Sequence, residues 1–196
     1  MSNININPII MKKLLLITAV VCLSLGQLNA QEPTFVKGDK VLNVALGLGN
    51  TLYTGTHYKG QIPPLSGSLE FGVVDNIIDE KGVIGVGPYI GYSSYKWEYL
   101  DWGWKYSNLI IGAKGNLHYP FVDKLDTYVG LLLGYNVASS KEFGVSIPGY
   151  DYSYSAGGIT WAGFVGARYY FKETFAVMAE LGYGIAYLNI GVALKL

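Results

Sequence analysis

Four charged side chains lie within otherwise apolar or small-residue segments and are the first candidates for chemistry. Arg168 and Glu180 flank the short Lys172–Thr174 sequence at nearly equal distances, so a hairpin turning there would bring them close together. A charge survives burial only when it is paired. We therefore predict an interior charge network that links Arg168 with Glu180 and holds Glu70 and Lys114 near the same depth. A structural role is the main interpretation, and a proton or ion pathway is the alternative.

The two histidines offer little for catalysis or metal binding. His57 and His118 have no second histidine, cysteine or nearby acid at the spacing of metal ligands. The one cysteine, Cys22, falls in a segment that we expect to be removed, which excludes disulfides and thiol catalysis from the mature chain. We predict no catalytic residue, no metal and no cofactor.

The start of the chain has the pattern of an export signal. A basic start at Lys12 and Lys13 precedes the apolar run Leu14–Leu25, and a small residue ends the segment. This run is too short to span a bilayer as a helix and is typical of a secretory signal peptide. We expect residues 1–30 to be upstream sequence plus a cleaved signal peptide, and residues 31–196 to form one domain.

The mature part alternates between apolar and small or polar residues with period two, which predicts β-strands. The connections between the segments alternate in length, so the long ones share one end of the sheet. The long connections are Thr51–Pro63, Ser94–Lys105 and Ala138–Gly158, and the short ones are Asp75–Lys81, Pro120–Asp126 and Lys172–Thr174. The eight expected strands are Val41–Gly49, Leu65–Val73, Val83–Tyr92, Asn108–Tyr119, Thr127–Asn136, Trp161–Phe171, Phe175–Tyr183 and Tyr187–Leu196.

The composition of the small and polar face decides which side of these strands is the interior. Only 14% of the residues are charged, whereas a soluble domain has roughly 25 to 35% charged residues on its surface. Small residues with a few paired charges suit a crowded barrel interior. The aliphatic face then points outward, where only lipid tolerates it, and a sheet in lipid must close on itself. We predict an all-β fold, an eight-stranded antiparallel up-and-down transmembrane β-barrel.

The chain resembles the small eight-stranded outer-membrane barrels of Gram-negative bacteria, of the OmpX, OmpA transmembrane domain and opacity-protein type. The resemblance rests on the architecture and on the last strand, LNIGVALKL, which alternates and ends on an apolar residue, Leu196, where the family usually has an aromatic one. It implies an outer-membrane location with both termini in the periplasm, contact with outer-membrane lipids, and recognition of the last strand by the barrel-assembly machinery. The near-neutral charge gives no reason to expect nucleic-acid binding.

Any recognition by such a barrel is expected in its long connections, because the wall is a scaffold. Exposed Tyr and Trp are typical binding anchors, and the alternative is that they extend the sheet above the membrane. We predict a structural or surface-interaction role through these loops. The alternatives are a narrow porin-like barrel that passes small or apolar solutes and, less favoured because His118 points inward, an outer-membrane lipid-modifying enzyme. The candidate recognition residues are Trp97, Trp102, Trp104, Tyr150 and Tyr152.

Overall fold

The computed structural model describes residues 33–52, 58–99, 102–144 and 153–196. Within these ranges it contains no helix that is long and apolar enough to cross a membrane. The signal-peptide prediction for residues 1–30 lies outside the described residues. The account below concerns the compact unit Glu32–Leu196.

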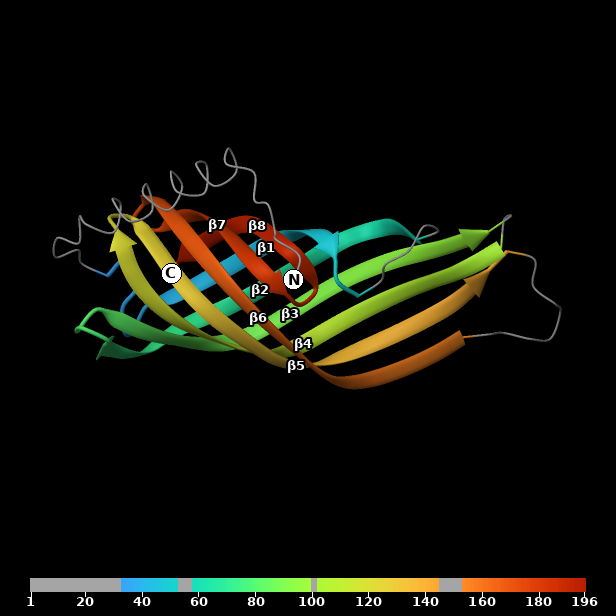
Figure 1. Cartoon of the computed structure of the whole chain (residues 1–196), viewed down its shortest axis with the longest axis horizontal. Coiled ribbons are helices and arrows are strands. Elements are labelled where there is room, and N and C mark those ends of the chain that lie inside the picture. The colour runs from blue at the N-terminus through green and yellow to red at the C-terminus, as the bar shows by residue number, and fades with distance from the viewer. Residues whose placement is uncertain (1–32, 53–57, 100–101, 145–152) are drawn as a thin grey trace, which may run out of the picture. The chain divides into compact units, whose positions relative to one another are not determined.

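The described part folds into eight antiparallel strands, each paired with its neighbours in sequence, and β1 also pairs with β8 to close the ring. Figure 1 shows the ring and the strand labels. The predicted eight-stranded antiparallel up-and-down barrel is therefore confirmed. The strands are β1 (Lys40–Asn50), β2 (Tyr58–Ile77), β3 (Gly82–Tyr99), β4 (Trp102–Val122), β5 (Leu125–Phe143), β6 (Ser153–Lys172), β7 (Phe175–Tyr183) and β8 (Ala186–Lys195).

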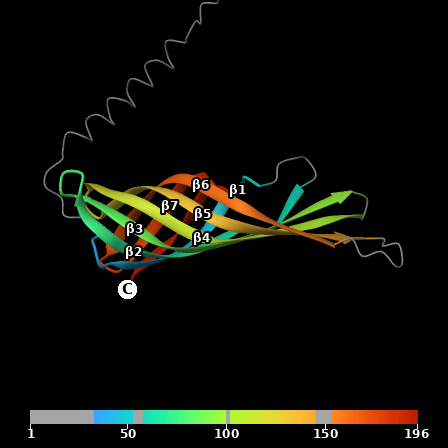
Figure 2. The same ribbon diagram turned by 90° about the horizontal axis from the view of Figure 1, so that it is seen from below.

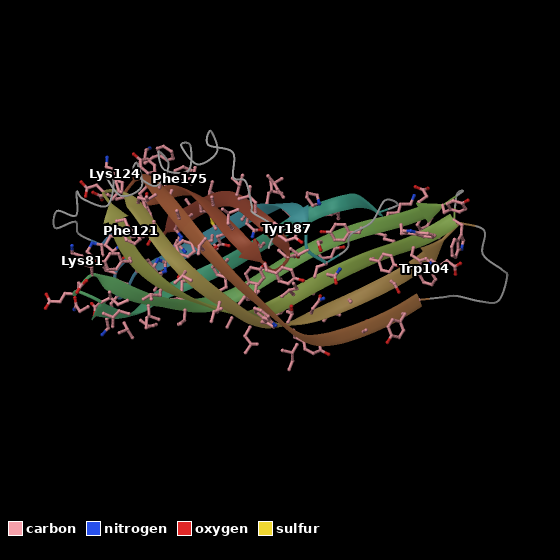
Figure 3. All side chains as sticks on the ribbon, viewed as in Figure 1. Lys81, Trp104, Phe121, Lys124, Phe175 and Tyr187 are labelled. Atoms are coloured by element: carbon pink, nitrogen blue, oxygen red, sulfur yellow. The ribbon has the colours of Figure 1, made fainter. Side chains whose placement is uncertain are left out.

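The polarity of the barrel is inverted relative to a soluble protein, as β5 illustrates. Leu131 and Leu133 are 66% and 65% exposed, while Tyr128 and Leu132 between and beside them are 5% exposed. Successive side chains of a strand point to opposite faces, so every second residue of β5 points away from the lumen. Figure 3 shows many side chains standing off the outer surface of the wall. The prediction of an outward aliphatic face agrees with this exposure pattern.

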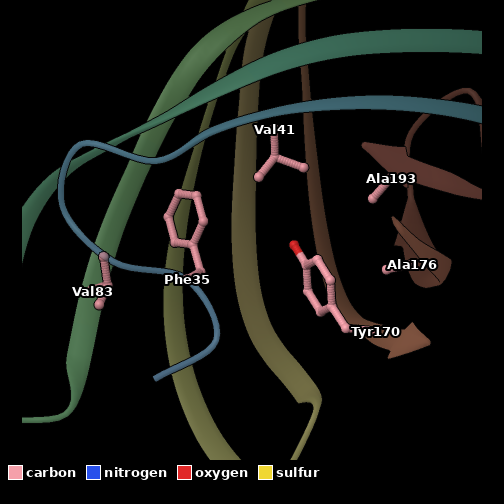
Figure 4. Close-up of a cluster of buried hydrophobic side chains, with 6 residues drawn as sticks. All are labelled: Phe35, Val41, Val83, Tyr170, Ala176 and Ala193. Atoms are coloured by element: carbon pink, nitrogen blue, oxygen red, sulfur yellow. The ribbon is translucent and has the colours of Figure 1, made fainter. Parts of the chain in front are cut away.

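The lumen is filled at its short-turn end by a cluster that includes a residue from before β1. Phe35 is 1% exposed and packs with Val41, Val83 and Tyr170 (Figure 4). The segment is fastened by the Lys195–Asp39 ion pair, with Nζ 2.7 Å from Oδ2. The sequence pattern did not predict this cluster, because a lone Phe before the first strand has no periodicity to interpret.

A second apolar cluster fills the lumen toward the opposite end. It consists of Tyr89, Ile110, Leu132, Ala162, Ile185 and Ala186, with Leu52 and Phe164 packed against it. We predicted an interior of small and polar residues, and the inner face is more apolar than that. A cavity of about 20 Å³ lies beside this cluster, about the space of one water molecule.

Five of the strands run far beyond the closed ring, which corrects the prediction of long loops. β1, β7 and β8 are 9 to 11 residues long, whereas β2 to β6 have 18 to 21 residues. Figures 1 and 2 show β3 to β6 continuing past the ends of β7 and β8. We call the part of β2 to β6 beyond the ring the projecting sheet. Strand replaces much of the expected loops Thr51–Pro63, Ser94–Lys105 and Ala138–Gly158, since β2 begins at Tyr58, β3 continues to Tyr99, β4 begins at Trp102, β5 continues to Phe143 and β6 begins at Ser153. In β3 the aromatic and charged residues also alternate with period two.

Two interior glycines leave space for aromatic rings that lie across the lumen. A Cβ atom added at Gly166 would lie 2.5 Å from ring atoms of Tyr128, and one at Gly130 would overlap Phe164. By contrast, a Cβ at Gly115, on the outer face, would meet nothing within 4 Å.

We expect Gly166→Val to lower the free energy of unfolding by about 1 to 3 kcal/mol, because overpacking displaces Tyr128. Urea unfolding of the refolded protein in phospholipid vesicles, followed by tryptophan fluorescence, measures this. Gly115→Val is the control and should cost much less. Equal effects of the two changes would contradict the assignment of inner and outer faces.

Candidate functional site

Arg168 of β6 is the centre of a buried ion-pair network in the lumen. Its side chain is 0% exposed, and its Nη1 lies 3.2 Å from Oδ2 of Asp126. Asp126 stands directly opposite Arg168 in the β5–β6 register. The other terminal nitrogen, Nη2, donates to Glu70 of β2. One guanidinium thus joins strands that are far apart in the sequence.

His118 of β4 bridges the same two carboxylates. Its Nδ1 lies 2.8 Å from Asp126 Oδ1 and its Nε2 lies 2.8 Å from Glu70 Oε1. Asn116 Nδ2 donates to the same Glu70 oxygen at 2.7 Å. The Phe35 ring covers the imidazole, with a centroid distance of 4.3 Å. A neutral imidazole has a single N–H, so both ring nitrogens donate only in the doubly protonated form.

A second buried ion pair lies on the same inner face. Lys114 Nζ is 2.6 Å from Glu180 Oε1, and the Tyr128 hydroxyl donates to the same oxygen at 2.9 Å. The ammonium also lies 4.2 Å from the centroid of the Phe164 ring. With a doubly protonated His118, the three cations of this network equal its three carboxylates in number.

The structure brings Glu70, Lys114, Arg168 and Glu180 into the lumen but pairs them differently from the prediction. Arg168 pairs with Glu70 and Asp126, and Glu180 pairs with Lys114. The predicted Arg168–Glu180 contact is wrong because Glu180 is opposite Gly166 in the β6–β7 hairpin, two positions from Arg168. Equal distance from a turn does not fix which partner a long side chain reaches.

Sequence reasoning missed Asp126 as a member of the network. It had been assigned to the short connection Pro120–Asp126, but β5 begins at Leu125 and Asp126 is 2% exposed. The tight turn at Asp123–Lys124 could have revealed it. This turn sets Asp126 opposite Pro120, and Asp126 is therefore two residues along the hairpin from the facing pair His118 and Tyr128. That register places a carboxylate within reach of the His118 ring.

The network joins four strands of the wall through buried charges. His118 and Asp126 are both 2% exposed, and each imidazole nitrogen already contacts a carboxylate. A general base needs a nitrogen within reach of the proton that it abstracts. In the part of the chain that the structure describes, no group of three or more His, Cys, Asp or Glu side chains is placed to hold a metal ion.

The predicted aromatic recognition residues lie on strands of the projecting sheet and not on a loop. Trp97 stands opposite Trp104 in the β3–β4 register, and Trp102 follows at the start of β4. The Trp102 ring packs edge-on against both, with centroid distances of 5.8 Å to Trp97 and 6.4 Å to Trp104. Trp102 Nε1 donates to Glu142 of β5. Figure 3 labels Trp104 near the far end of the projecting sheet.

These indoles lie on the face of the sheet that continues the barrel interior. Trp104, Tyr106 and Asn108 alternate along β4 in step with Lys114, Asn116 and His118 of the lumen. These three tryptophans lie on strands that extend the sheet. Their position above the membrane and their use as binding anchors stay predictions. Tyr150, Tyr152 and His57 lie outside the described residues.

Comparison with known proteins gives structural matches alone. No protein-family model matches the chain, and no curated protein matches it. The Ail protein of Yersinia pestis, solved in complex with the heparin analogue sucrose octasulfate, is 12% identical over 82% of this chain and 96% of its own, with a TM-score of 0.49. The N-terminal β-barrel domain of Pseudomonas aeruginosa OprF is 16% identical over 81% and 98%, with a TM-score of 0.47. A designed transmembrane β-barrel is 18% identical over 83% and 98%, with a TM-score of 0.44.

We expect Glu70→Gln to lower the free energy of unfolding by about 3 to 5 kcal/mol, because it removes one partner of a buried charge. The matched control is Glu98→Gln, which breaks the half-exposed Lys96–Glu98 pair and should cost about 0 to 1 kcal/mol. Urea unfolding in vesicles measures both. Adding Arg168→Gln to Glu70→Gln should cost less than Arg168→Gln alone. Independent effects of the two changes would show that the two side chains are not coupled.

Proposed function

We propose that the protein is a non-enzymatic outer-membrane β-barrel that contacts a partner outside the cell through the projecting sheet. The observation that carries this proposal is the extension of β3 to β6 past the closed ring, with Trp97, Trp102 and Trp104 on one face. A membrane-spanning strand needs about 9 to 11 residues, which the β7 and β8 lengths of 9 and 10 match. The additional length of β3 to β6 serves no membrane-spanning purpose.

The outer surface of the ring supports a membrane location. Its exposed side chains include Ile90, Ile111, Leu131, Leu133 and Val165, each more than half exposed. Contiguous apolar surface of this kind is stable only where lipid or another apolar surface covers it. Because both chain ends of the barrel lie at the short-turn end, we place the termini in the periplasm and the projecting sheet outside, as is usual for bacterial barrels.

The projecting sheet offers a partner a free strand edge beside the aromatic face. β6 pairs with β7 only from Gly163 onward, so Ser153–Ala162 has β5 as its one strand partner among the described residues. This stretch has no charged residue and no proline, the usual devices that protect an edge from pairing. An extended polypeptide segment can add to such an edge by backbone hydrogen bonds.

The filled lumen favours this role over the porin-like alternative. Phe35 and its cluster occupy the short-turn end, the ion pairs follow, and the cluster around Ile110 and Leu132 occupies the other end. A solute would have to break the ion pairs to pass. The burial of His118 between two carboxylates likewise gives no support to a lipid-modifying activity.

A cysteine-labelling experiment tests the location and orientation together. We expect Tyr154→Cys, in the projecting sheet, to react with a membrane-impermeant maleimide on intact cells. Glu80→Cys, in the β2–β3 turn, should react only after the outer membrane is permeabilised. The one native cysteine, Cys22, precedes the barrel. Labelling of Glu80→Cys but not Tyr154→Cys on intact cells would overturn the orientation.

Single-channel recording tests the choice between a filled barrel and a pore. The refolded protein in planar bilayers should show no steady open conductance, because three layers of side chains occupy the lumen. Glu70→Gln is the comparison variant, and we expect brief openings to become more frequent when the network is weakened. A steady conductance of the unmodified protein would contradict the proposal and favour the alternative of a porin-like barrel.

A further inference from the structure

Lysines of four neighbouring strands stand in cross-strand register in the projecting sheet, beginning with Lys59 of β2 opposite Lys96 of β3. Lys96 of β3 is opposite Lys105 of β4, and Lys105 is opposite Lys141 of β5. We call these three residues the lysine row. They lie on the face opposite to the tryptophans, because Trp97 and Trp104 are each one residue away along their strands. The pairing is continuous from Val83–His118 to Tyr99–Trp102, so no bulge turns the lysines inward.

The lysine row follows the apolar surface of the barrel in an ordered sequence of rows. The row Ile90, Ile111, Tyr135 and Ile159 is at least half exposed and apolar. Two residues farther stands the row Tyr92, Leu109, Val137 and Gly157, and then come four serines in register, Ser94, Ser107, Ser139 and Ser155. The lysine row is the next row along the strands. The outer face thus changes from aliphatic to hydroxyl to cationic within about six residues, or roughly 20 Å of strand.

Three cations placed opposite one another are unfavourable without a counter-charge. Neighbouring strands are about 4.8 Å apart, and like charges directly opposite destabilise a sheet. Lys96 is compensated in part, because its Nζ lies 2.9 Å from Glu98 Oε1 and 4.1 Å from the centroid of the Phe143 ring. Lys105 and Lys141 are exposed, and neither forms an ion pair with another described residue. The arrangement has a positive charge that an external anion would balance.

We propose that the lysine row binds the phosphate groups of anionic lipids in the leaflet that surrounds the barrel at this end. Strands tilted by about 40° place the row roughly 10 Å beyond the Tyr92 row. Lysine side chains reach back toward the apolar surface, so their ammonium groups fall within the headgroup layer of about 5 to 8 Å. Ser94 is buried, and the small side chains of Ser107 and Ser139 leave space for a headgroup next to the wall. This inference rests on the membrane location proposed above.

The test uses the refolded full barrel in zwitterionic detergent micelles that contain equal amounts of phosphatidylglycerol and phosphatidylcholine. Native mass spectrometry counts the lipids that stay bound to the protein. A lysine near a charged lipid surface strengthens binding about fivefold, so the unmodified protein should prefer phosphatidylglycerol by at least about tenfold. The triple variant Lys96→Gln, Lys105→Gln, Lys141→Gln keeps Lys59 and should lose most of that preference. Added salt should weaken the preference in the unmodified protein.

The matched control removes three exposed or half-exposed lysines from the short-turn end, Lys81→Gln, Lys124→Gln, Lys172→Gln, and should keep the preference. A preference that survives the first triple change, or that both triple changes abolish equally, would overturn the inference. Binding of inorganic phosphate with the same affinity as the lipid would reject a lipid source. Heat-dependent gel migration shows whether each variant is folded. The labelling of Tyr154→Cys tests the membrane location independently. Absence of a lipid preference would therefore overturn this inference and leave the proposed function intact.

Discussion

A barrel with an apolar outer surface has its polar and charged side chains in the lumen. It can fold only if those charges are paired there, because the lumen holds little more than side chains. An eight-stranded ring has an interior just wide enough for side chains to fill it. Within that space the structure sets Arg168 and His118 between the carboxylates of Glu70 and Asp126. These contacts join β2, β4, β5 and β6. The closed backbone ladder and the balanced interior therefore support each other, because opening the ring would expose unpaired strand edges and separate the charges.

The same arrangement divides the barrel into two structural parts. The ring, where β1, β7 and β8 complete the wall, is filled by the two apolar clusters and the ion pairs between them. The projecting sheet has lost those partners and presents two different faces and a free edge along β6. Its inner face carries the indoles and its outer face carries the lysine row. A polypeptide partner outside the cell and the lipid headgroups would thus contact opposite faces of the same strands.

The period-two pattern predicted the ring correctly because the outward face is almost entirely aliphatic, as in Leu131 and Leu133. It failed where the alternation uses other residue types. Tyr95, Trp97 and Tyr99 alternate with Lys96 and Glu98, and they were assigned to a loop although they continue β3.

The membership of the interior network was predictable in part, and its pairing was not. The charges Glu70, Lys114, Arg168 and Glu180 stand out on a small-residue face, so their inward position followed from composition. Their partners depend on registers that join strands across long connections, such as the β5–β6 register that sets Asp126 against Arg168. No feature of the sequence fixes such a register. The Phe35 cluster could not be predicted from the sequence for a related reason, because its members come from segments that are distant in the chain.

The direct measurement of the central claim is a spin-label scan of β5 from Val129 to Tyr135 in phospholipid vesicles. Collisions with oxygen, which dissolves in lipid, and with a water-soluble nickel complex are recorded at each position. Labels at Val129, Leu131, Leu133 and Tyr135 should collide often with oxygen, whereas the intervening labels, which face a filled lumen, should be protected from both reagents. Frequent collisions of the nickel complex with labels at Leu131 and Leu133, or the absence of any alternation, would contradict a lipid-facing barrel.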